Sequence, residues 1–310
     1  MAHLKETPIE KQATVQVKPF ATALGAEVIC GNVNRLSPAD LEMVRQAWLD
    51  HLVLLVRGQT LSADDLIGFA KTFGEVDLAT PVSELPAGVK ERPNPYISMV
   101  SNVKEDGMPI GTLGDGEVVW HTDMSYHEAP ISASILYAIE VPEVGGRTGF
   151  VNMYEALESL PEQEQERVRA LSIKNDATYN SAGQIRRGMN PVTDVRTSPG
   201  VTHPAVRTHP ETNHNALYLG RRPNAYINGL DVDESEKLLN MLWSHATSRP
   251  AWFHQWEVGD IVLWDNRCVM HRREPFDPST RRIMQRLQCK GDAPIQRKEA
   301  SRLPHPRSRL

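Results

Sequence analysis

The sequence predicts a mainly β protein with flanking helices, built around a β-sandwich or jelly-roll core. Short apolar runs typical of strands recur along the chain and are separated by turn-forming residues. Helical periodicity is confined to a region near the N-terminus and to insertions between these runs. A chain of 310 residues can fold as one β-rich domain. We expect that domain over residues 17–292, between a flexible N-terminus, residues 1–16, and a C-terminal tail, residues 293–310.

Composition narrows the class of protein. Hydrophobic residues make up 40% and charged residues 24% of the chain, as in soluble globular proteins. The net charge of −5 argues against a nucleic-acid partner, which usually requires a basic surplus. The three cysteines are far apart, the N-terminus has no apolar signal-peptide core, and no apolar run is long enough for a membrane span. We therefore expect a cytoplasmic protein with neither nucleic acid nor membrane as a partner.

The N-terminal elements carry clear capping signals. A helix is predicted over residues 38–51, with Ser37 as its N-cap and an apolar stripe along one face. The apolar run 52–58 that follows predicts a buried strand. A second helix is predicted over residues 62–74, since Ser62 can cap its start and a glycine stands at its end.

The remaining elements follow from the same patterns. Residues 78–116 are rich in Pro and Gly and are predicted to form long loops. Residues 174–200 contain few large apolar residues and are the candidate for a lid over a site. The other predicted elements are strands over 131–142, 203–210, 215–220 and 281–291, two strands joined around Gly259 and Asp260, short surface helices over 152–171 and an amphipathic helix over 233–248.

One short motif suggests a metal site. His121 and Asp123 are two residues apart, so on a strand both side chains project to one face, roughly 6–7 Å apart. Taken alone, this pair also fits a hydrogen-bonded histidine and a turn-forming aspartate. His271, at the end of the apolar strand that begins at Ile261, can supply a third ligand from a distant strand. Two histidines and one carboxylate form the facial triad of non-haem Fe(II) oxygenases.

Such a triad leaves coordination positions for other molecules. A 2-oxo acid can fill two of them through its carboxylate and keto oxygen, which leaves one for O₂. Its far carboxylate then needs an anchor, and the guanidinium of Arg282, eleven residues after His271, offers a bidentate grip. Alternation along a strand places Arg282, Met284 and Arg286 on one face. For Arg286 the alternative of a solvent-facing side chain at a sheet edge stays open.

With these residues in place, the chain resembles the Fe(II)/2-oxoglutarate-dependent dioxygenases of the taurine dioxygenase and 2,4-dichlorophenoxyacetate dioxygenase family. The resemblance runs from about Val17 to Asp292 and rests on six segments in order: LGAEV, FAKTFGEV, WHTD, GGRTGFVNMYEAL, WDNRCVMHR and RRIMQR. It implies a double-stranded β-helix, which is a cupin-like jelly roll, and a dimer or tetramer of identical chains.

The resemblance also implies roles for single residues. It makes His121, Asp123 and His271 the iron ligands. It makes Thr148 and Arg282 the partners of the distal carboxylate of 2-oxoglutarate, and Arg286 the residue that holds the substrate anion. The implied reaction consumes Fe(II)-bound 2-oxoglutarate and O₂ and hydroxylates an organic acid, an aryl or aryloxy carboxylate or a sulfonate. Where the hydroxylated carbon bears a heteroatom leaving group, the product can break at a C–O, C–S or C–N bond.

One position departs from the family pattern. Taurine dioxygenases carry an asparagine four residues before the first histidine ligand, whereas this chain has Glu117. An ionised carboxylate there would repel a sulfonate, which argues against taurine as the substrate. Glu117 therefore either faces away from the site or meets a cationic group of the substrate.

Neighbouring residues have assigned roles as well. Trp120 and Tyr126 are candidates for lining the substrate pocket, and Arg186 and Arg187 are candidates for facing an anion from the lid. We expect the following to be structural or peripheral: Trp264, Cys268 and Cys289 in packing, Asp265 and Asn266 in hydrogen bonds to ligands or in a turn, His127 at a rim, and His203, His209 and His214 in loops.

Two alternatives remain at this point. One is a metal enzyme on a cupin-like fold that does not use 2-oxoglutarate. The other is a catalytically silent binding module that keeps the scaffold. Arg282 and Thr148 argue against the first, and the intact ligand set argues against the second.

Overall fold

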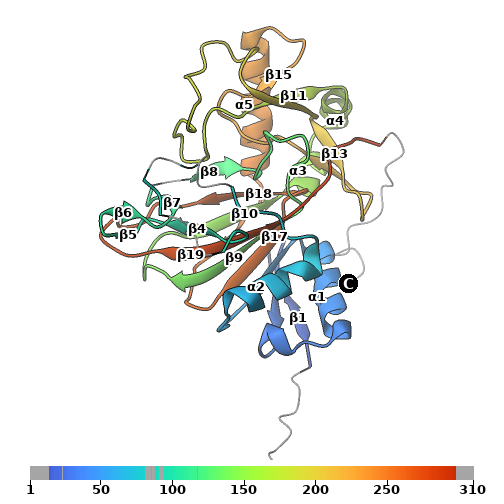
Figure 1. Cartoon of the computed structure of the whole chain (residues 1–310). Helices are drawn as coiled ribbons and strands as arrows, with labels where there is room; N and C mark the ends of the chain where they lie inside the picture. The colour runs from blue at the N-terminus through green and yellow to red at the C-terminus, as the bar shows by residue number, and fades with distance from the viewer. Residues whose placement is uncertain are drawn as a thin grey trace, which may run out of the picture.

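Two mainly antiparallel sheets form the centre of the molecule (Figure 1). The computed structural model describes residues 14–297, apart from residues 23, 81–84, 86–87, 91–93 and 117. The larger sheet has eight strands in the order β1 (Gln16–Pro19), β2 (Ala26–Ile29), β3 (Val53–Val56), β17 (Ile261–Asp265), β9 (Ala133–Glu140), β19 (Ile283–Cys289), β4 (Ser98–Ser101) and β7 (Thr112–Leu113). The smaller sheet has four, in the order β16 (Trp252–His254), β10 (Thr148–Asn152), β18 (Val269–Arg273) and β8 (Val118–His121). The described chain is therefore mainly β with several helices, as predicted.

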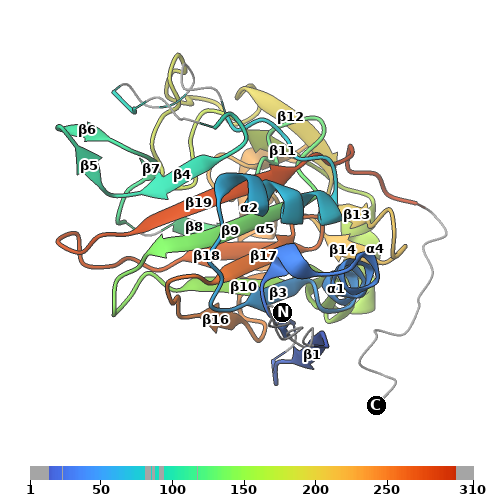
Figure 2. The same cartoon turned by 60° about the horizontal axis from the view of Figure 1, so that its bottom comes forward.

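The central strands of the larger sheet are buried on both faces. On one face Leu55 and Val262 pack with Phe150 and Met270 of the smaller sheet in a shared core. On the other face, residues such as Leu54 pack against two helices, α1 (Pro38–His51) and α2 (Ala63–Ala70), which cover that side of the sheet in Figure 2. This explains the apolar run at β3, because neighbouring side chains point to opposite faces and both faces are dry.

The two N-terminal helices begin where their capping residues predict. The Ser37 side chain accepts from the backbone N–H of Asp40, and the Asp40 carboxylate accepts in return from the N–H of Ser37. Ser62 and Asp65 form the same capping box at α2, which continues into a 3-10 turn, η2 (Lys71–Phe73). Another 3-10 turn of the same length, η1 (Val33–Arg35), precedes α1.

The prediction of long loops over residues 78–116 is wrong in part. β4 and β7 lie in this segment and complete one edge of the larger sheet, and β5 (Lys104–Glu105) pairs with β6 (Met108–Pro109) as a hairpin. The strands are only two to four residues long and stand among Pro and Gly residues. Such short strands show no readable alternation, so their pairing partners rather than their own pattern define them.

Two further predictions need correction. α3 (Met153–Glu158) is buried rather than at the surface, since Tyr154 and Leu157 pack into the shared core, whereas α4 (Glu162–Arg169) is largely exposed. The segment around Gly259 holds β16 and β17 as expected, but these two strands belong to different sheets. His271 does not end β17; it lies in β18, a separate strand that follows a tight turn.

A third layer lies beyond the smaller sheet. The three-stranded sheet β12 (Gly200–Pro204), β11 (Ser172–Asp176) and β15 (Tyr226–Ile227) packs with α5 (Val232–Thr247), and β13 (Val206–Thr208) pairs with β14 (Asn215–Leu217). Figure 1 shows the long connection between β11 and β12, residues 177–199, looping over the end of the sheets where β8 lies. Within the described residues, every helix is too short or too polar to cross a membrane.

Candidate metal centre and anion pocket

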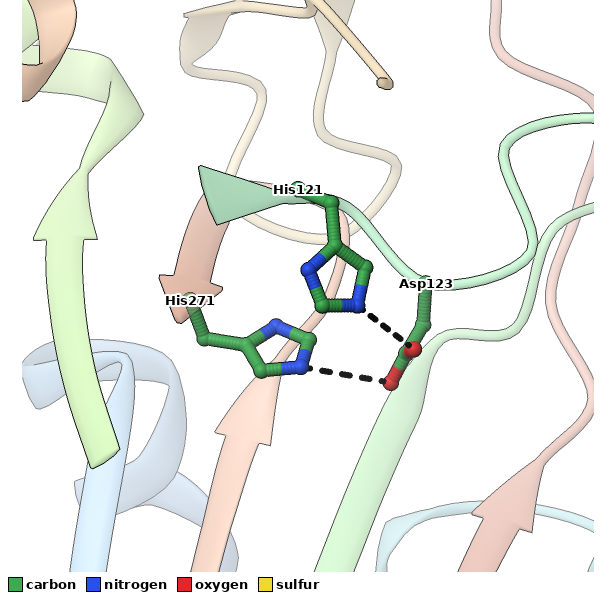
Figure 3. A group of neighbouring side chains, drawn as sticks. All are labelled: His121, Asp123 and His271. Carbon is green, nitrogen blue, oxygen red and sulfur yellow. Dashed lines mark ion pairs between the residues drawn. The ribbon is translucent and has the colours of Figure 1, made fainter. Parts of the chain in front are cut away.

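Three buried side chains converge at the edge of the smaller sheet. His121 Nε2 lies 3.4 Å from Asp123 Oδ1, and His271 Nε2 lies 3.8 Å from Asp123 Oδ2, as Figure 3 shows. One ligand atom from each residue falls within 4.8 Å of the other two, which is a spacing that one metal ion can bridge. The structure thus brings together the three residues that the sequence proposed as a triad.

Strand pairing accounts for this convergence. His121 ends β8 and pairs directly with His271 of β18, so the two imidazoles come from adjacent strands of one sheet, with ring centroids 4.2 Å apart. Asp123 follows two residues later, where β8 has already ended. A bulge between His271 and Arg273 breaks the ladder at this edge. Bulges are common beside functional sites because they redirect a side chain.

Two residues orient Asp123, and only one of them was predicted from the sequence to bond a metal ligand. The Asn266 amide accepts from the backbone N–H of Asp123 and donates to its carbonyl, at 2.9 Å each. The Ser134 hydroxyl donates to Asp123 Oδ2 at 2.8 Å. Asn266 was a candidate for such a role, whereas Ser134 carried no signal because it lies on β9, in the opposite sheet. Both contacts hold the carboxylate toward the two histidines.

The protonation states favour metal binding. His121 Nδ1 lies 2.8 Å from the carbonyl of Val119, which can only accept, so Nδ1 donates to this carbonyl and Nε2 is the nitrogen that faces Asp123. Burial, together with His121, lowers the pKa of His271 to about 3, so its imidazole stays neutral. Burial alone would raise the pKa of Asp123, but His271, His121 and Arg286 outweigh it and hold that pKa well below its usual range. Neutral imidazoles and an ionised carboxylate are the forms that bind a metal.

A second group of buried side chains surrounds Arg282. This guanidinium is 1% exposed, and it lies 5.9 Å from the ring centroids of both Trp256 and Phe276. Its Nε has no hydrogen-bond partner among the described residues. Burial and the neighbouring Arg273 lower the pKa of Arg282 to about 9. Thr148 is buried on the same side, and its hydroxyl oxygen accepts from the indole N–H of Trp256 at 2.9 Å.

A cavity opens beside the triad on the side of the long β11–β12 connection. Arg286 lines it with its Nη1 3.7 Å from Asp123 Oδ1, so this arginine points inward and not to solvent. Tyr126 lines it as well, in agreement with its proposed place in the pocket. The described residues around the cavity are Thr80, Leu85, Thr112, Leu113, Asp123, Met124, Tyr126, Asn180, Ser181, Ile185, Arg186, Arg221 and Arg286.

Arg221 is the lining residue that sequence reasoning missed. Its backbone pairs with that of His121, and the N–H of Thr122 donates to the carbonyl of Gly220 at 2.9 Å. Gly220 has φ +67°, and a Cβ there would lie 1.8 Å from the side-chain oxygen of Asn175. Only glycine fits this turn, which delivers Arg221 to the metal site. In the sequence this segment is only a glycine followed by two arginines, a pattern that surface turns also show, so it did not identify Arg221 as a site residue.

Other candidates lie elsewhere. Trp120 packs edge-on against Phe253, with ring centroids 6.2 Å apart, and is not among the described residues that line the cavity. The structure therefore shows a packing contact for Trp120, and its contact with the substrate stays a prediction. His127 is exposed, as expected for a rim residue, and Trp264 packs its ring 4.5 Å from that of His271. Glu117 falls outside the described residues.

A second group of potential metal ligands is closed to metal. His209 Nε2 bonds Asp265 Oδ2 at 2.9 Å, and its Nδ1 accepts from the backbone N–H groups of Glu211 and Thr212. Arg267 binds both oxygens of Asp265, at 2.8 and 2.7 Å. Burial raises the pKa of the Cys268 thiol well above its usual range. Because each donor atom is already engaged or protonated, this is a structural network that ties the turn after β17 to the β13–β14 hairpin.

Buried neutral histidines predict a pH dependence of stability. Burial lowers the pKa of His203, His209 and His271, the last to about 3, from a typical value near 6.5 in the unfolded chain. Below about pH 6.5 the unfolded state therefore binds more protons than the folded state, so stability falls as the pH falls. For His271 alone this is about 1.4 kcal/mol per pH unit. Urea unfolding of the metal-free protein should show a lower free energy of unfolding at pH 5.5 than at pH 7.5, and a flat profile would contradict these pKa shifts.

A mainly β protein with two histidines and one carboxylate around one point has the architecture of a non-haem metal oxygenase. The family described as "Taurine catabolism dioxygenase TauD, TfdA family" matches residues 16–288. The (S)-phenoxypropionate/alpha-ketoglutarate-dioxygenase of Delftia acidovorans is 33% identical over 288 residues, which cover 88% of this chain and 94% of that protein. The alpha-ketoglutarate-dependent 2,4-dichlorophenoxyacetate dioxygenase of Cupriavidus pinatubonensis is 32% identical over 274 residues, 84% of this chain and 92% of that protein.

A solved structure agrees with these matches. The crystal structure of AAD-2 in complex with Mn(II) and N-oxalylglycine is similar to this chain with a TM-score of 0.73 at 27% identity, covering 92% of this chain and 100% of that one. The chain belongs to the TauD/TfdA family of alpha-ketoglutarate-dependent dioxygenases. This confirms the resemblance found in the sequence and decides against both alternatives considered there. The protein is an enzyme that uses 2-oxoglutarate, a metal ion and dioxygen.

Proposed function

We propose that this enzyme hydroxylates an organic acid, an aryl or aryloxy carboxylate or a sulfonate, and that cleavage follows where the hydroxylated carbon bears a leaving group. The observation that carries the proposal is the inward Arg286 beside the His121–Asp123–His271 group. Relatives named for phenoxypropionate and 2,4-dichlorophenoxyacetate support an aryloxy acid. The family described by taurine catabolism supports a sulfonate.

The three converging side chains are proposed as the ligands of Fe(II). His121 and His271 each direct Nε2 toward Asp123, so one ion can take one nitrogen from each and one oxygen from the carboxylate. Fe(II) held in this way supplies the redox chemistry that couples 2-oxoglutarate oxidation to C–H hydroxylation. The protein's own contribution is orientation, through Ser134 and Asn266, and a site from which bulk water is excluded.

Arg282 and Thr148 are proposed to hold the distal carboxylate of 2-oxoglutarate. An unpaired buried guanidinium is costly, and a carboxylate that it can grip through two N–H groups removes most of that cost. Trp256 donates to the Thr148 oxygen, so the Thr148 hydroxyl proton remains available for a second bond to the same carboxylate. Arg282 directly precedes β19 of the larger sheet, and Thr148 is the first residue of β10 in the smaller sheet.

The two central sheets are proposed to form a double-stranded β-helix. Eight strands on one side and four on the other enclose the shared core, and the triad lies at one end of the smaller sheet. In this arrangement the β11–β12 connection, residues 177–199, serves as the lid, since Asn180, Ser181, Ile185 and Arg186 face the cavity.

The proposal is tested by a succinate-formation screen with the Arg286→Ala variant. Sulfonates, aryloxyalkanoates and amino-acid derivatives are supplied with Fe(II) and 2-oxoglutarate. For the acid that the wild-type enzyme uses, Arg286→Ala should lower kcat/KM about thirtyfold or more, because a buried charge pair is lost. Uncoupled 2-oxoglutarate turnover without substrate should persist.

A matched control comes from the same part of the chain. Arg281 is exposed and pairs with Glu140 at 2.6 Å, so Arg281→Ala should leave substrate use unchanged. Equal loss of substrate use and of uncoupled turnover in Arg286→Ala would show that Arg286 serves the cosubstrate or the scaffold. A screen in which no organic acid stimulates succinate formation would refute the substrate class.

A further inference from the structure

Three arginines, and not one, face the cavity beside the metal site. They are Arg186 from the β11–β12 connection, Arg221 from the turn after β14, and Arg286 from β19. The Nε atom of each is buried and has no hydrogen-bond partner within the described part of the chain. Arg221 is 7% exposed and spends one Nη1 bond, 2.9 Å, on the carbonyl of Tyr179. Three guanidinium groups thus bring unused donors to one recess.

Two of these arginines contact the ring of Tyr126. The guanidinium carbon of Arg186 lies 4.1 Å from the Tyr126 ring centroid, and that of Arg221 lies 5.1 Å from it. Stacking on an aromatic ring positions a guanidinium while leaving its N–H edge free for an anion. Burial, together with the positive charge of Arg186, lowers the pKa of Arg221 to about 10, so the two guanidinium groups repel each other, and an anion bound by both would relieve that repulsion.

Counted over the described residues alone, the charges of the recess do not balance without such an anion. Asp123 is the only carboxylate among the described residues that line the cavity, and it also belongs to the metal triad. Three arginines and one carboxylate leave a surplus of two positive charges. The two positive charges of Fe(II) and the two negative charges of 2-oxoglutarate cancel, so binding of both leaves this surplus in place.

We propose that the prime substrate is a dianion at neutral pH, with its second negative charge held by Arg186 and Arg221 over Tyr126. This inference rests on the proposed function and deepens it, since Arg286 alone would suffice for a monoanionic acid. It assigns Arg221 as a specificity-determining residue, and its position is set by the backbone pairing with His121. Carboxylate, phosphonate and phosphate groups can all supply the second negative charge. The property that such substrates share is two negative charges on one small molecule.

Two probes of the same shape but different charge test the proposal. Benzenesulfonate carries one negative charge, whereas phenylphosphonate carries two at roughly pH 9, well above its second ionisation. Each is titrated by calorimetry into the full-length protein loaded with Mn(II) and 2-oxoglutarate, which does not turn over. We expect phenylphosphonate to bind about tenfold tighter or more, and this preference to fall below about threefold in Arg221→Gln.

Arg222→Gln is the matched control. Arg222 is the next residue, and it points away from the cavity to pair with Glu236 and Asn240 of α5, so its replacement should keep the full preference. Equal binding of both probes to the wild-type protein would overturn the inference while leaving a monoanionic organic acid as the substrate. A preference that survives in Arg221→Gln would also overturn it, since the metal and not the arginines would then select the phosphonate. Failure of 2-oxoglutarate itself to bind would instead refute the proposed function.

Discussion

Replacing His121 with alanine is expected to abolish metal-dependent succinate formation while leaving the metal-free protein folded. His121 supplies one of three donor atoms that lie within 4.8 Å of one another. Loss of a partner that only orients a metal ligand typically lowers affinity 10- to 100-fold, so loss of a ligand itself should cost about a hundredfold or more. The measurements are Mn(II) affinity by calorimetry and succinate formation with Fe(II) and 2-oxoglutarate.

His127→Ala provides the control for this variant. His127 lies six residues further along the chain, but its side chain is exposed and its ring lies tilted beside that of Tyr126, with ring centroids 4.5 Å apart, outside the triad. It should retain the wild-type metal affinity. Retention of wild-type Mn(II) affinity in His121→Ala would remove His121 from the ligand set and leave the triad as a hydrogen-bonded structural group.

The triad could be predicted from the sequence because two of its members are close together in it. His121 and Asp123 are two residues apart, so the end of β8 at His121 and the turn directly after it place both at one edge of the smaller sheet. His271 was assigned to the wrong strand. A turn closed by Asp265 and Arg267 separates β17 from β18, and the apolar Val269 and Met270 at the start of β18 conceal that break in the sequence. The residue was still the correct partner, because its direct pairing with His121 does not depend on which strand carries it.

The residues that the sequence did not reveal are those placed by contacts between distant segments. Ser134 reaches Asp123 across the two sheets, and Arg221 reaches the cavity through a glycine turn after β14. Neither stands in a periodic pattern, and both are polar residues of types common at surfaces. The strands of residues 78–116 were missed for a related reason, since a strand at the edge of a sheet is defined by its neighbour and not by its own apolar pattern.

Replacing Arg282 with methionine is expected to raise the free energy of unfolding and, at the same time, to weaken 2-oxoglutarate binding. Its guanidinium is 1% exposed between Trp256 and Phe276, and the positive charge of Arg273 is close enough to lower its pKa. An uncompensated buried charge destabilises the protein, and an apolar side chain of similar length removes that cost. Arg282→Met should therefore raise the free energy of unfolding of the metal-free protein by about 1 kcal/mol or more.

The same change should weaken 2-oxoglutarate binding strongly, because it removes the charged partner of a buried carboxylate. Such a loss costs about 3–5 kcal/mol, which is roughly a hundredfold or more in affinity. Urea unfolding and calorimetry with Mn(II) present measure the two effects on one preparation. Arg281→Met, at the exposed neighbour, should change neither by more than about 0.5 kcal/mol. A less stable Arg282→Met protein with wild-type 2-oxoglutarate affinity would show that Arg282 supports the fold and does not bind the cosubstrate. The two opposite effects are expected together because a buried charge whose partner is the cosubstrate destabilises the protein without it and binds it when it is present.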